Sequence, residues 1–550
     1  MKNFLKQEII KSIKRLEWSE FIPDFMIHVE NIPLTHRQLG DYYTNAAMTV
    51  YKKEILPRGE KAEKIKEELL KSKTLKKILE KIEVAPPGFI NFFLRDDWVC
   101  AKIGEILKQG EKFGSSNLGK GEKVQVEFIS ANPTGPLTLG NGRGGFLGDV
   151  LSNVLEKVGY KVFREFYVND APFDNTQIQI LGKSIKCQVK GIKYQGEEDL
   201  YKGAYIKDLA KKFTIKQVKE LSDGELGKKA AKILLEKEIK PIIKNLGIKF
   251  DKFFLENSLY KTGAVKKAVF NLSRKNLTYQ KEGALWFKST KFSDEKDRVL
   301  QRKDGAYTYF AADIAYHLNK FKERKFEKVI DIWGADHFGY VKRMQGAMEA
   351  FGYKDKLKII ICQLVRLLKQ GREVRMSKRK GVFVTLNDLI KEVGQDVARF
   401  FFLTKTPETH LDFDLDKAKE KSEKNPVYYI QYASARIFGI LAKLKTKNLK
   451  LKTTTKNLKL LIHPAELQLI KQLLKFPDLL EEISQNYEVQ KLPFYAQELT
   501  TSFHNFYEKC RVLDPKNPDL TTARISLVLA TSNVLKNTLD ILGIKAPERM

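Results

Sequence analysis

A glycine-rich segment at residues 130–144 could bind phosphate groups, and it has the sequence SANPTGPLTLGNGRG. Glycine lets backbone N–H groups approach a ligand closely, and the N-terminus of a helix favours anions. Alternating apolar residues typical of a strand precede the segment, and apolar residues at helical spacing follow it. The sequence therefore predicts a phosphate-binding loop at the start of a helix.

A second segment suited to phosphate chemistry lies far downstream, where residues 375–381 read RMSKRKG. The ammonium group of Lys378 could follow the negative charge that develops on a leaving pyrophosphate. Gly371 and Gly381 flank the segment and would let it close over a nucleotide. Taken alone, the same string is also compatible with an ordinary basic surface loop.

The first segment has two other interpretations. Gly140, Gly142 and Gly145 match the G-x-G-x-x-G dinucleotide fingerprint, and Glu165 follows at a suitable distance, so a nicotinamide-dependent dehydrogenase is an alternative. That fingerprint follows its strand directly, whereas here the loop 130–139 intervenes, which disfavours the alternative. The glycines could also serve only close packing of the helix.

In this order, the two segments together resemble the signature motifs of class I aminoacyl-tRNA synthetases, and the surrounding chain resembles arginyl-tRNA synthetase. The first motif of that family normally reads His-x-Gly-His, whereas the matching positions here are Thr138, Leu139, Gly140 and Asn141. The resemblance implies catalytic roles for Thr138, Gly140, Asn141 and Lys378, with a hydroxyl and an amide as donors in place of the imidazoles. The missing histidines keep a non-catalytic RNA-binding relative as an alternative.

The resemblance implies a ligase, an arginine–tRNA ligase. It would activate L-arginine with ATP to arginyl-adenylate and transfer the arginine to the 3′ end of tRNA(Arg), releasing AMP and pyrophosphate. The substrate carboxylate attacks the α-phosphorus, so no side-chain nucleophile is needed, and Mg²⁺ bound with ATP helps to neutralise the phosphates. No dedicated metal site is expected. The implied ATP-binding residues are Pro133, Gly135, Leu139, Gly142, Gly334, Asp336, Met376 and Ser377.

Recognition of a guanidinium group requires carboxylates, polar acceptors and an aromatic face. Tyr309 and Asp313 are spaced so that they would share one face of a helix. Glu127 ends the first expected strand of the catalytic region and precedes Asn132 at the spacing of the family's glutamate–asparagine pair. The arginine-binding residues implied by the resemblance are Glu127, Ser130, Asn132, Tyr309, Asp313 and His337.

The C-terminal region carries residues suited to RNA. The segment Asn425–Arg436 resembles the anticodon-binding helix of the family, and Asp396–Arg399 resembles its preceding boundary. Tyrosine and arginine can stack on unpaired bases, and glutamine can read base edges. The implied tRNA-binding residues are Gln431, Tyr432, Arg436 and Met550.

The elements that must position these residues include three further apolar strands, expected at Lys161–Val168, Val329–Trp333 and Lys358–Leu364. Such strands alternating with helices predict a doubly wound parallel sheet in an α/β fold. In the N-terminal region, Lys61–Ile82 is expected to be helical. With the resemblance, three domains are expected: a small tRNA-contacting α/β domain at 1–110, a Rossmann-type catalytic domain at 111–405 with an insertion at about 170–300, and an all-α anticodon-binding domain at 406–550.

The composition fits a multidomain globular protein, because the 550 residues are 43% hydrophobic and 30% charged. The net charge of +31 suits a polyanionic partner such as RNA, although lysine spread along the whole chain would give the same value. No apolar run has the length of a membrane span, and the basic, amphipathic N-terminus is expected to be a helix of the mature protein. Free thiols in a protein of this size favour a reducing compartment, so a cytoplasmic protein is expected. The four cysteines lack metal-ligand spacing. The resemblance implies a monomer.

Overall fold

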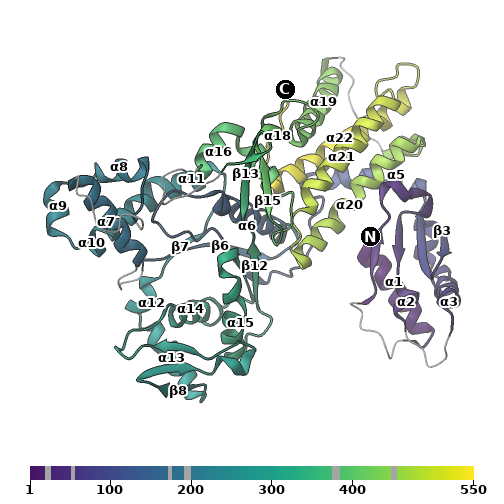
Figure 1. Ribbon diagram of the computed structural model, residues 1–550. Helices are drawn as coiled ribbons and strands as arrows, with labels where there is room; N and C mark the ends of the chain where they lie inside the picture. The colour runs from purple at the N-terminus through teal and green to yellow at the C-terminus, as the bar shows by residue number, and fades with distance from the viewer. Residues whose placement is uncertain (19–25, 51–55, 171–175, 191–199, 375–383, 447–454) are drawn as a thin grey trace.

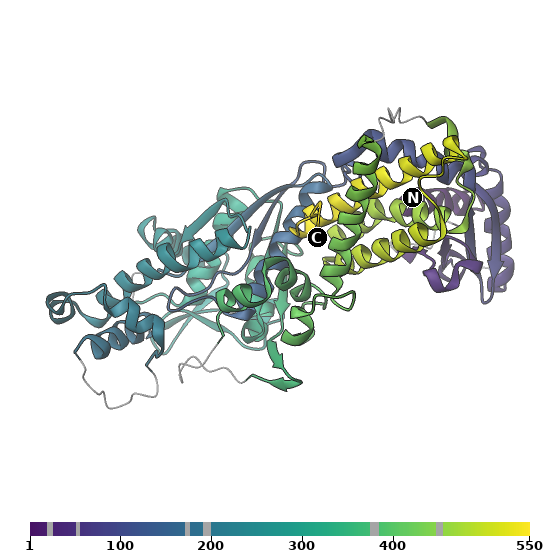
Figure 2. The same ribbon diagram turned by 90° about the horizontal axis from the view of Figure 1, so that it is seen from above.

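The structure is a computed structural model that describes residues 1–18, 26–50, 56–170, 176–190, 200–374, 384–446 and 455–550. The chain forms an elongated molecule (Figures 1 and 2). A helical insertion lies at one end and the N-terminal domain at the other. The catalytic sheet and the C-terminal helices lie between them. Within the described ranges, no helix is both long enough and apolar enough to cross a membrane.

The central sheet has the strand order β12-β11-β5-β6-β7, and all neighbouring strands in it are parallel. Connections from β5 run first to β6 on one side and later to β11 on the other, so the strand order reverses between β5 and β11. Ligands bind at such a switch point, at the carboxyl ends of the strands. The expected parallel sheet is thereby confirmed. Its strands are β5 (Lys123–Glu127), β6 (Lys161–Val168), β7 (Lys252–Leu255), β11 (Lys328–Gly334) and β12 (Leu357–Cys362).

Helix α6 (Leu139–Lys157) begins at this switch point. Thr138 is its N-cap, and the side chains of Thr138 and Asn141 bond to each other's backbone N–H groups in a capping box. Apolar residues at helical spacing, among them Phe146 and Val150, are fully buried. Gly159 follows the helix with a φ of 96°, a conformation that glycine adopts without steric cost.

The range 170–300 contains two additions rather than one, because β7 returns to the central sheet between them. The first is a helical bundle with its own hydrophobic core. Its long helices cross closely at Gly182 and Gly227, where an added Cβ would lie 1.9 Å from the backbone oxygens of Asp223 and Ile178. The bundle comprises α7 (Thr176–Lys190), α8 (Ala204–Ala210), α9 (Ile215–Glu220) and α10 (Asp223–Leu234), and the following α11 (Lys240–Asn245) packs into the main core instead.

The second addition packs α12 (Asn257–Lys261) and α13 (Ala264–Arg274) beside a small antiparallel sheet. This sheet has the order β10-β9-β8. Its strands are β8 (Thr278–Lys281), β9 (Ala284–Phe287) and β10 (Arg298–Gln301).

The N-terminal domain is an antiparallel sheet of order β1-β2-β4-β3, together with α1 (Lys2–Arg15), α2 (Ala46–Thr49) and two further helices. The prediction of a helix over Lys61–Ile82 is wrong at its C-terminal end. Helices α3 (Arg58–Leu70) and α4 (Lys73–Ile78) stop before Leu79, because the following residues pair with β4 and bury Ile82 opposite Phe92. The strands are β1 (Val29–Asn31), β2 (Tyr42–Thr44), β3 (Leu79–Ala85) and β4 (Phe89–Leu94).

A small sheet links the catalytic part to the C-terminal helices. Strand β15 (Leu411–Asp414) pairs in parallel with β13 (Val365–Lys369), and β14 (Arg372–Glu373) forms the other edge. Residues beyond 405 therefore still belong to this sheet, and the helical region begins after α18 (Leu415–Lys419). That region consists of α19 (Pro426–Thr446), α20 (Pro464–Asn486), α21 (Lys491–Lys509) and α22 (Pro518–Leu542).

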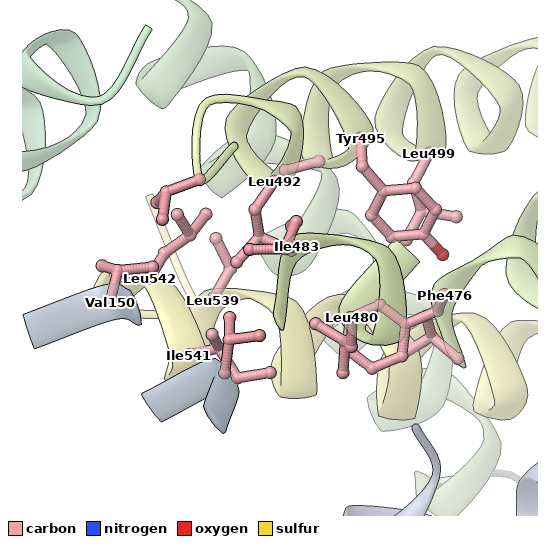
Figure 3. Packing of buried hydrophobic residues seen from close by; sticks show 14 of the residues in the cluster. Val150, Phe476, Leu480, Ile483, Leu492, Tyr495, Leu499, Leu539, Ile541 and Leu542 are labelled. Atoms are coloured by element: carbon pink, nitrogen blue, oxygen red, sulfur yellow. The ribbon is translucent and has the colours of Figure 1, made fainter. Parts of the chain in front are cut away.

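Helix α6 packs directly against the C-terminal helices. Figure 3 shows Val150 of α6 beside Leu539 and Leu542 of α22. Behind this contact, the guanidinium of Arg399 on α17 (Gln395–Phe402) is 1% exposed. It donates to Asp149 Oδ2 of α6 at 2.5 Å and to the backbone oxygen of Leu542 at 3.1 Å. The helix that starts at the ligand-binding edge and the last helix of the chain thus share one core, and the Arg399 guanidinium, which is ion-paired to α6, also binds the carboxyl end of α22.

Candidate active site

A cavity of about 500 Å³ opens at the carboxyl edge of β5, β6 and β11, against α14 (Tyr309–Leu318). The six residues expected to bind arginine all line it, although they come from distant parts of the chain. The structure thus brings the whole set together. The set is Glu127, Ser130, Asn132, Tyr309, Asp313 and His337.

Tyr309 and Asp313 reach the cavity from one face of α14, which Thr308 caps by accepting a hydrogen bond from the Ala311 N–H. Tyr309 is about half exposed at 52%, and its ring forms part of the rim. The hydroxyl of Tyr340 donates to Asp313 Oδ2 at 2.6 Å. Burial raises the pKa of Asp313, against the lowering effect of Tyr340. The Asp313 carboxylate is thus oriented by a neutral partner.

The cavity also contains Glu256, which follows β7 and is only 2% exposed. Burial, then the negative charges of Asp313 and Asp170, raise the pKa of Glu256 to about 8. Among the described residues, neither Glu256 nor Asp313 forms an ion pair. Sequence reasoning missed Glu256. The available signal was an acidic residue directly after a strand, in the range interpreted as an insertion.

Glu127 and Ser130 form the floor of the cavity. The Ser130 hydroxyl donates to Glu127 Oε1 at 2.9 Å and accepts a hydrogen bond from the Tyr167 N–H at 3.0 Å. Glu127 is buried, and Lys320 Nζ donates to its other oxygen at 2.6 Å. This carboxylate is therefore already paired with a cation.

Asn132 and His337 lie at the exposed side of the cavity. The Asn132 amide donates to Gln177 Oε1 of α7 at 2.9 Å. The His337 ring lies with its centroid 6.0 Å from the ring of Trp333. Both side chains are accessible to a ligand that enters from solvent.

On the nucleotide side, Thr138 and Asn141 replace the two histidines of the family motif. The capping box limits which hydrogen-bond donors these two side chains can offer to a ligand. The Thr138 hydroxyl donates to Asn141 Oδ1 at 2.8 Å, and the Thr138 N–H donates to the same oxygen at 2.9 Å. In this arrangement the hydroxyl proton of Thr138 is already donated within the capping box and is not available to a ligand. Within the part of the chain that is described, no acceptor is bonded to Asn141 Nδ2, so the amide N–H groups of Asn141 remain for a ligand.

The residues of the first motif differ in their surroundings. Gly140 is exposed, and the nearest atom to an added Cβ would be Thr138 Oγ1 at 3.7 Å. Gly142 is buried, and an added Cβ would lie 2.5 Å from Leu386 Cδ1, so its small size serves packing. The Leu139 side chain is likewise buried in the core. Only the backbone of Leu139 and Gly142 can therefore face a nucleotide.

The other expected nucleotide residues lie on both sides of the switch point. Pro133 and Gly135 belong to the buried part of the loop before α6, where the Tyr205 hydroxyl donates to the Thr134 carbonyl at 3.2 Å. Gly334 and Asp336 are exposed at the end of β11. Met376, Ser377 and Lys378 lie outside the described residues.

Within the described ranges, no group of three or more His, Cys, Asp or Glu side chains could hold a metal ion. The cysteines that the structure describes are free thiols.

The expected RNA-binding residues lie on or near α19. Gln431 Nε2 donates to Asp396 Oδ2 at 2.9 Å and to the Lys545 carbonyl at 3.1 Å, so it ties α19 to α17 and to the C-terminal segment. The Arg436 guanidinium lies 4.7 Å from the ring centroid of Tyr432 and donates to its hydroxyl at 2.6 Å. Met550 is 55% exposed.

Three family models match the chain in sequence. The arginyl tRNA synthetase N terminal domain matches residues 3–94, the catalytic domain of class I (R) tRNA synthetases matches residues 102–422, and the DALR anticodon binding domain matches residues 430–550. Together these matches extend over nearly the whole chain.

Similar proteins agree with these matches. An arginine–tRNA ligase of Carboxydothermus hydrogenoformans is 45% identical, over 93% of this chain and 92% of its own. Arginine–tRNA ligase 1 of Halalkalibacterium halodurans is 42% identical over 100% and 99%. The Thermus thermophilus arginyl-tRNA synthetase structure has the same fold, with a TM-score of 0.76 and 20% identity over 100% of both chains.

Proposed function

This chain belongs to the arginyl-tRNA synthetase family, and we propose that it ligates arginine to tRNA(Arg) with the residues gathered at the switch point. It activates L-arginine with ATP to arginyl-adenylate and transfers the arginine to the 3′ end of the tRNA, releasing pyrophosphate and then AMP. The observation that carries the assignment of the pocket is that two acidic side chains, the partly buried Asp313 and the buried Glu256, face one cavity without an ion pair among the described residues. The dehydrogenase alternative is set aside, because the family has a different chemistry.

The guanidinium group of arginine enters between Asp313 and Glu256. Two carboxylates can accept the forked N–H groups of a guanidinium in a geometry that an ammonium cannot match. Tyr309 covers the planar cation with its ring, as aromatic faces do for guanidinium groups. Asn132 and His337 at the exposed side hold the α-amino and carboxylate groups of the substrate. Glu127 and Ser130 fix the floor.

ATP binds across the start of α6. Gly140 lets the phosphates approach the backbone, and the helix N-terminus favours their negative charge. The loop residues Pro133 and Gly135, with the backbone of Leu139 and Gly142, line one side, and Gly334 and Asp336 line the other. Asn141 Nδ2 and the ammonium of Lys378 donate to the phosphates as charge moves onto the pyrophosphate. Met376 and Ser377 extend this contact, and Thr138 acts by holding Asn141 in the capping box.

Mg²⁺ enters with ATP and, when bound, neutralises phosphate charge. The chain's own contribution is positional, because the arginine carboxylate must be held in line with the α-phosphorus. After activation, a ribose hydroxyl of the tRNA end attacks the adenylate.

The tRNA is held by the other parts of the chain. We assign tRNA contacts to residues 1–110, catalysis to the part from residue 111 to the end of α18 with its two additions within about 170–300, and anticodon binding to the helical region that follows. In the last of these, Tyr432 and Arg436 stack on unpaired bases, while Gln431 and Met550 lie beside them. A cytoplasmic monomer fits this assignment.

ATP–pyrophosphate exchange with arginine tests the proposal, run with and without tRNA(Arg) and with lysine as the control amino acid. We expect exchange with arginine and no exchange with lysine. Exchange that appears only with tRNA would show that RNA completes the site. RNA binding without exchange under either condition would instead support the non-catalytic alternative raised by the missing histidines.

A further inference from the structure

Lys320 lies beneath the arginine pocket, and the mechanism above does not use it. It belongs to the π-helical turn Asn319–Glu323 that continues α14, and its side chain is 0% exposed. Turns of this kind are frequent at functional sites. Lys320 Nζ donates to Glu127 Oε2 at 2.6 Å and to Asp331 Oδ1 at 2.8 Å. A buried lysine is costly to place, so this arrangement requires a reason.

The two carboxylates that Lys320 contacts occupy paired positions on neighbouring strands. Glu127 of β5 is in register with Asp331 of β11, so both side chains leave the sheet on the same face. Without a cation between them, two buried like charges would repel, and one would take up a proton. Although burial opposes it, Lys320 and then His317 lower the pKa of Asp331. Burial raises the pKa of Glu127, and Lys320 acts against this shift. Lys320 therefore favours the ionised form of both carboxylates, and its two hydrogen bonds hold them in place.

The ion pair of Lys320 and Glu127 also distinguishes one acidic residue of the pocket, which has a cation, from the others, which have none. Three carboxylates line the cavity, and Lys320 balances one of them, Glu127. Within the described ranges no cation pairs with Asp313 or Glu256. The position of Lys320 therefore determines which carboxyl groups of the pocket are left without a cation.

Glu127 in turn holds the turn that leads into the phosphate loop. Its Oε1 accepts the Ser130 hydroxyl bond, and Ser130 and its neighbour Ile129 have φ values of 34° and 67°. Residues other than glycine rarely adopt this left-handed region, so the turn needs support from its surroundings. If Glu127 rotated away from Lys320, Ser130 would lose its acceptor, and the segment that carries Asn132 would be released.

We propose that Lys320 is a positioning residue for arginine recognition. It fixes Glu127 between Asp331 and Ser130, and it thereby reserves Asp313 and Glu256 for the guanidinium group. This inference rests on the proposed function, since it names the residue that sets the selectivity of the same pocket.

Two variants separate positioning from mere stability. Lys320→Met leaves the carboxylates of Glu127 and Asp331 buried without their cation. The double variant Lys320→Met/Asp331→Asn removes one charge of each sign, so the buried charge sum equals that of the unmodified protein. Glu127 still lacks its donor in the double variant. Lys322→Met, in the same turn but exposed, is the matched control.

The measurements are the KM for arginine and the kcat in ATP–pyrophosphate exchange, together with Tm for each variant. We expect Lys320→Met to raise the KM for arginine by about 30-fold or more, the size of effect that a lost buried charge partner produces. The Tm should fall in this variant and recover in the double variant, while the KM stays raised in both. The control should match the unmodified protein.

Recovery of the KM together with Tm in the double variant would overturn the proposal, because Lys320 would then act only on stability. An unchanged KM in Lys320→Met would also overturn it. Absence of exchange in the unmodified protein is a different result. That outcome removes the proposed function itself, whatever the variants do.

Discussion

The polar side chains of the pocket beside α14 and those at the RNA-facing end of α19 differ in whether they already have partners within the protein. In the pocket, Asp313 and Glu256 are sheltered, and among the described residues they have no ion pair. On α19, Gln431 already bonds to Asp396, and Arg436 lies against Tyr432. A buried charge without a cation is costly until a ligand supplies one, whereas a satisfied surface group must exchange one bond for another. Changes in the pocket should therefore have much larger effects than changes on α19.

The largest effect is expected for Asp313→Asn, which removes a charge from the pocket and keeps its shape. The kcat/KM for arginine in pyrophosphate exchange should fall by about 10³-fold, because the guanidinium loses one of two buried charge partners. Asp304→Asn, an exposed residue in the turn before α14, should have no effect. Equal losses in the two variants would remove the contrast between the pocket and the surface.

A smaller effect, on kcat rather than KM, is expected for Asn141→Ala. Losing one donor to developing charge typically lowers kcat by about 10²-fold. Asn153→Ala provides the control, since Asn153 lies further along α6 and donates to the Ile541 carbonyl. That variant should lower Tm without changing kcat. If kcat is unchanged in Asn141→Ala, the phosphate contact lies elsewhere in the site.

The pH dependence of kcat/KM for arginine should follow the titration of the Glu256 carboxyl group. Its carboxyl has a pKa of about 8 in the free enzyme, raised by burial and by Asp313, so below that pH it is mostly protonated and cannot pair with a guanidinium. The kcat/KM for arginine should therefore rise with pH, by up to about tenfold per unit below the pKa, and level off above it.

Glu256→Gln should abolish this inflection, and any titration of the substrate's own amino group should persist. A profile that is identical in the variant would assign the titration to another group. The same shift has a consequence for stability. The raised pKa makes Glu256 lower the stability of the free enzyme progressively as pH rises from its usual value of 4.5 to about 8, and arginine should offset this loss.

The smallest effects are expected on α19. Tyr432→Ala should raise the KM for tRNA by roughly 5- to 10-fold, near the lower range for one lost stacking contact, and leave tRNA-free exchange unchanged. Gln431→Ala should instead lower stability by about 1 kcal/mol, because it breaks internal hydrogen bonds. Aminoacylation kinetics and thermal unfolding distinguish the two. A Gln431 variant that keeps its Tm and loses tRNA affinity would show that the glutamine reads the RNA.

The sequence predicts the framework of the site well, because short-range patterns encode it. The apolar runs at β6, β11 and β12 and the helix start after the glycine-rich loop follow from local chemistry, and the spacing of Tyr309 and Asp313 places both on one face of a helix. The strand at Leu79 was predicted as helix, since its pairing with β4 is a tertiary effect that local propensity does not contain.

Glu256 and Lys320 could not be predicted in this way. Glu256 reaches the pocket because β7 pairs with β6. Lys320 can bridge Glu127 and Asp331 because β5 and β11 place these two residues side by side. Neither fact can be read from a window of sequence. The same holds for Gln431, whose residue type suits base reading but whose amide is hydrogen-bonded to Asp396 and Lys545 in the fold. Residue type and spacing predict where a side chain lies, and the fold decides whether its polar atoms are still available.

The buried pair of Asp149 and Arg399 has a consequence for exchanging parts between relatives. A chimera joined anywhere between these two residues would place one partner of the pair in a foreign chain, together with one half of the core that Val150 shares with Leu539 and Leu542. An unmatched partner would leave a buried charge uncompensated at the back of the nucleotide-binding helix. A joint between α18 and α19 keeps this pair within one parent but still divides the core that Val150 shares with Leu539 and Leu542, so the catalytic and anticodon-binding segments are not independent modules. Functional hybrids require that α6, α17 and α22 come from the same parent.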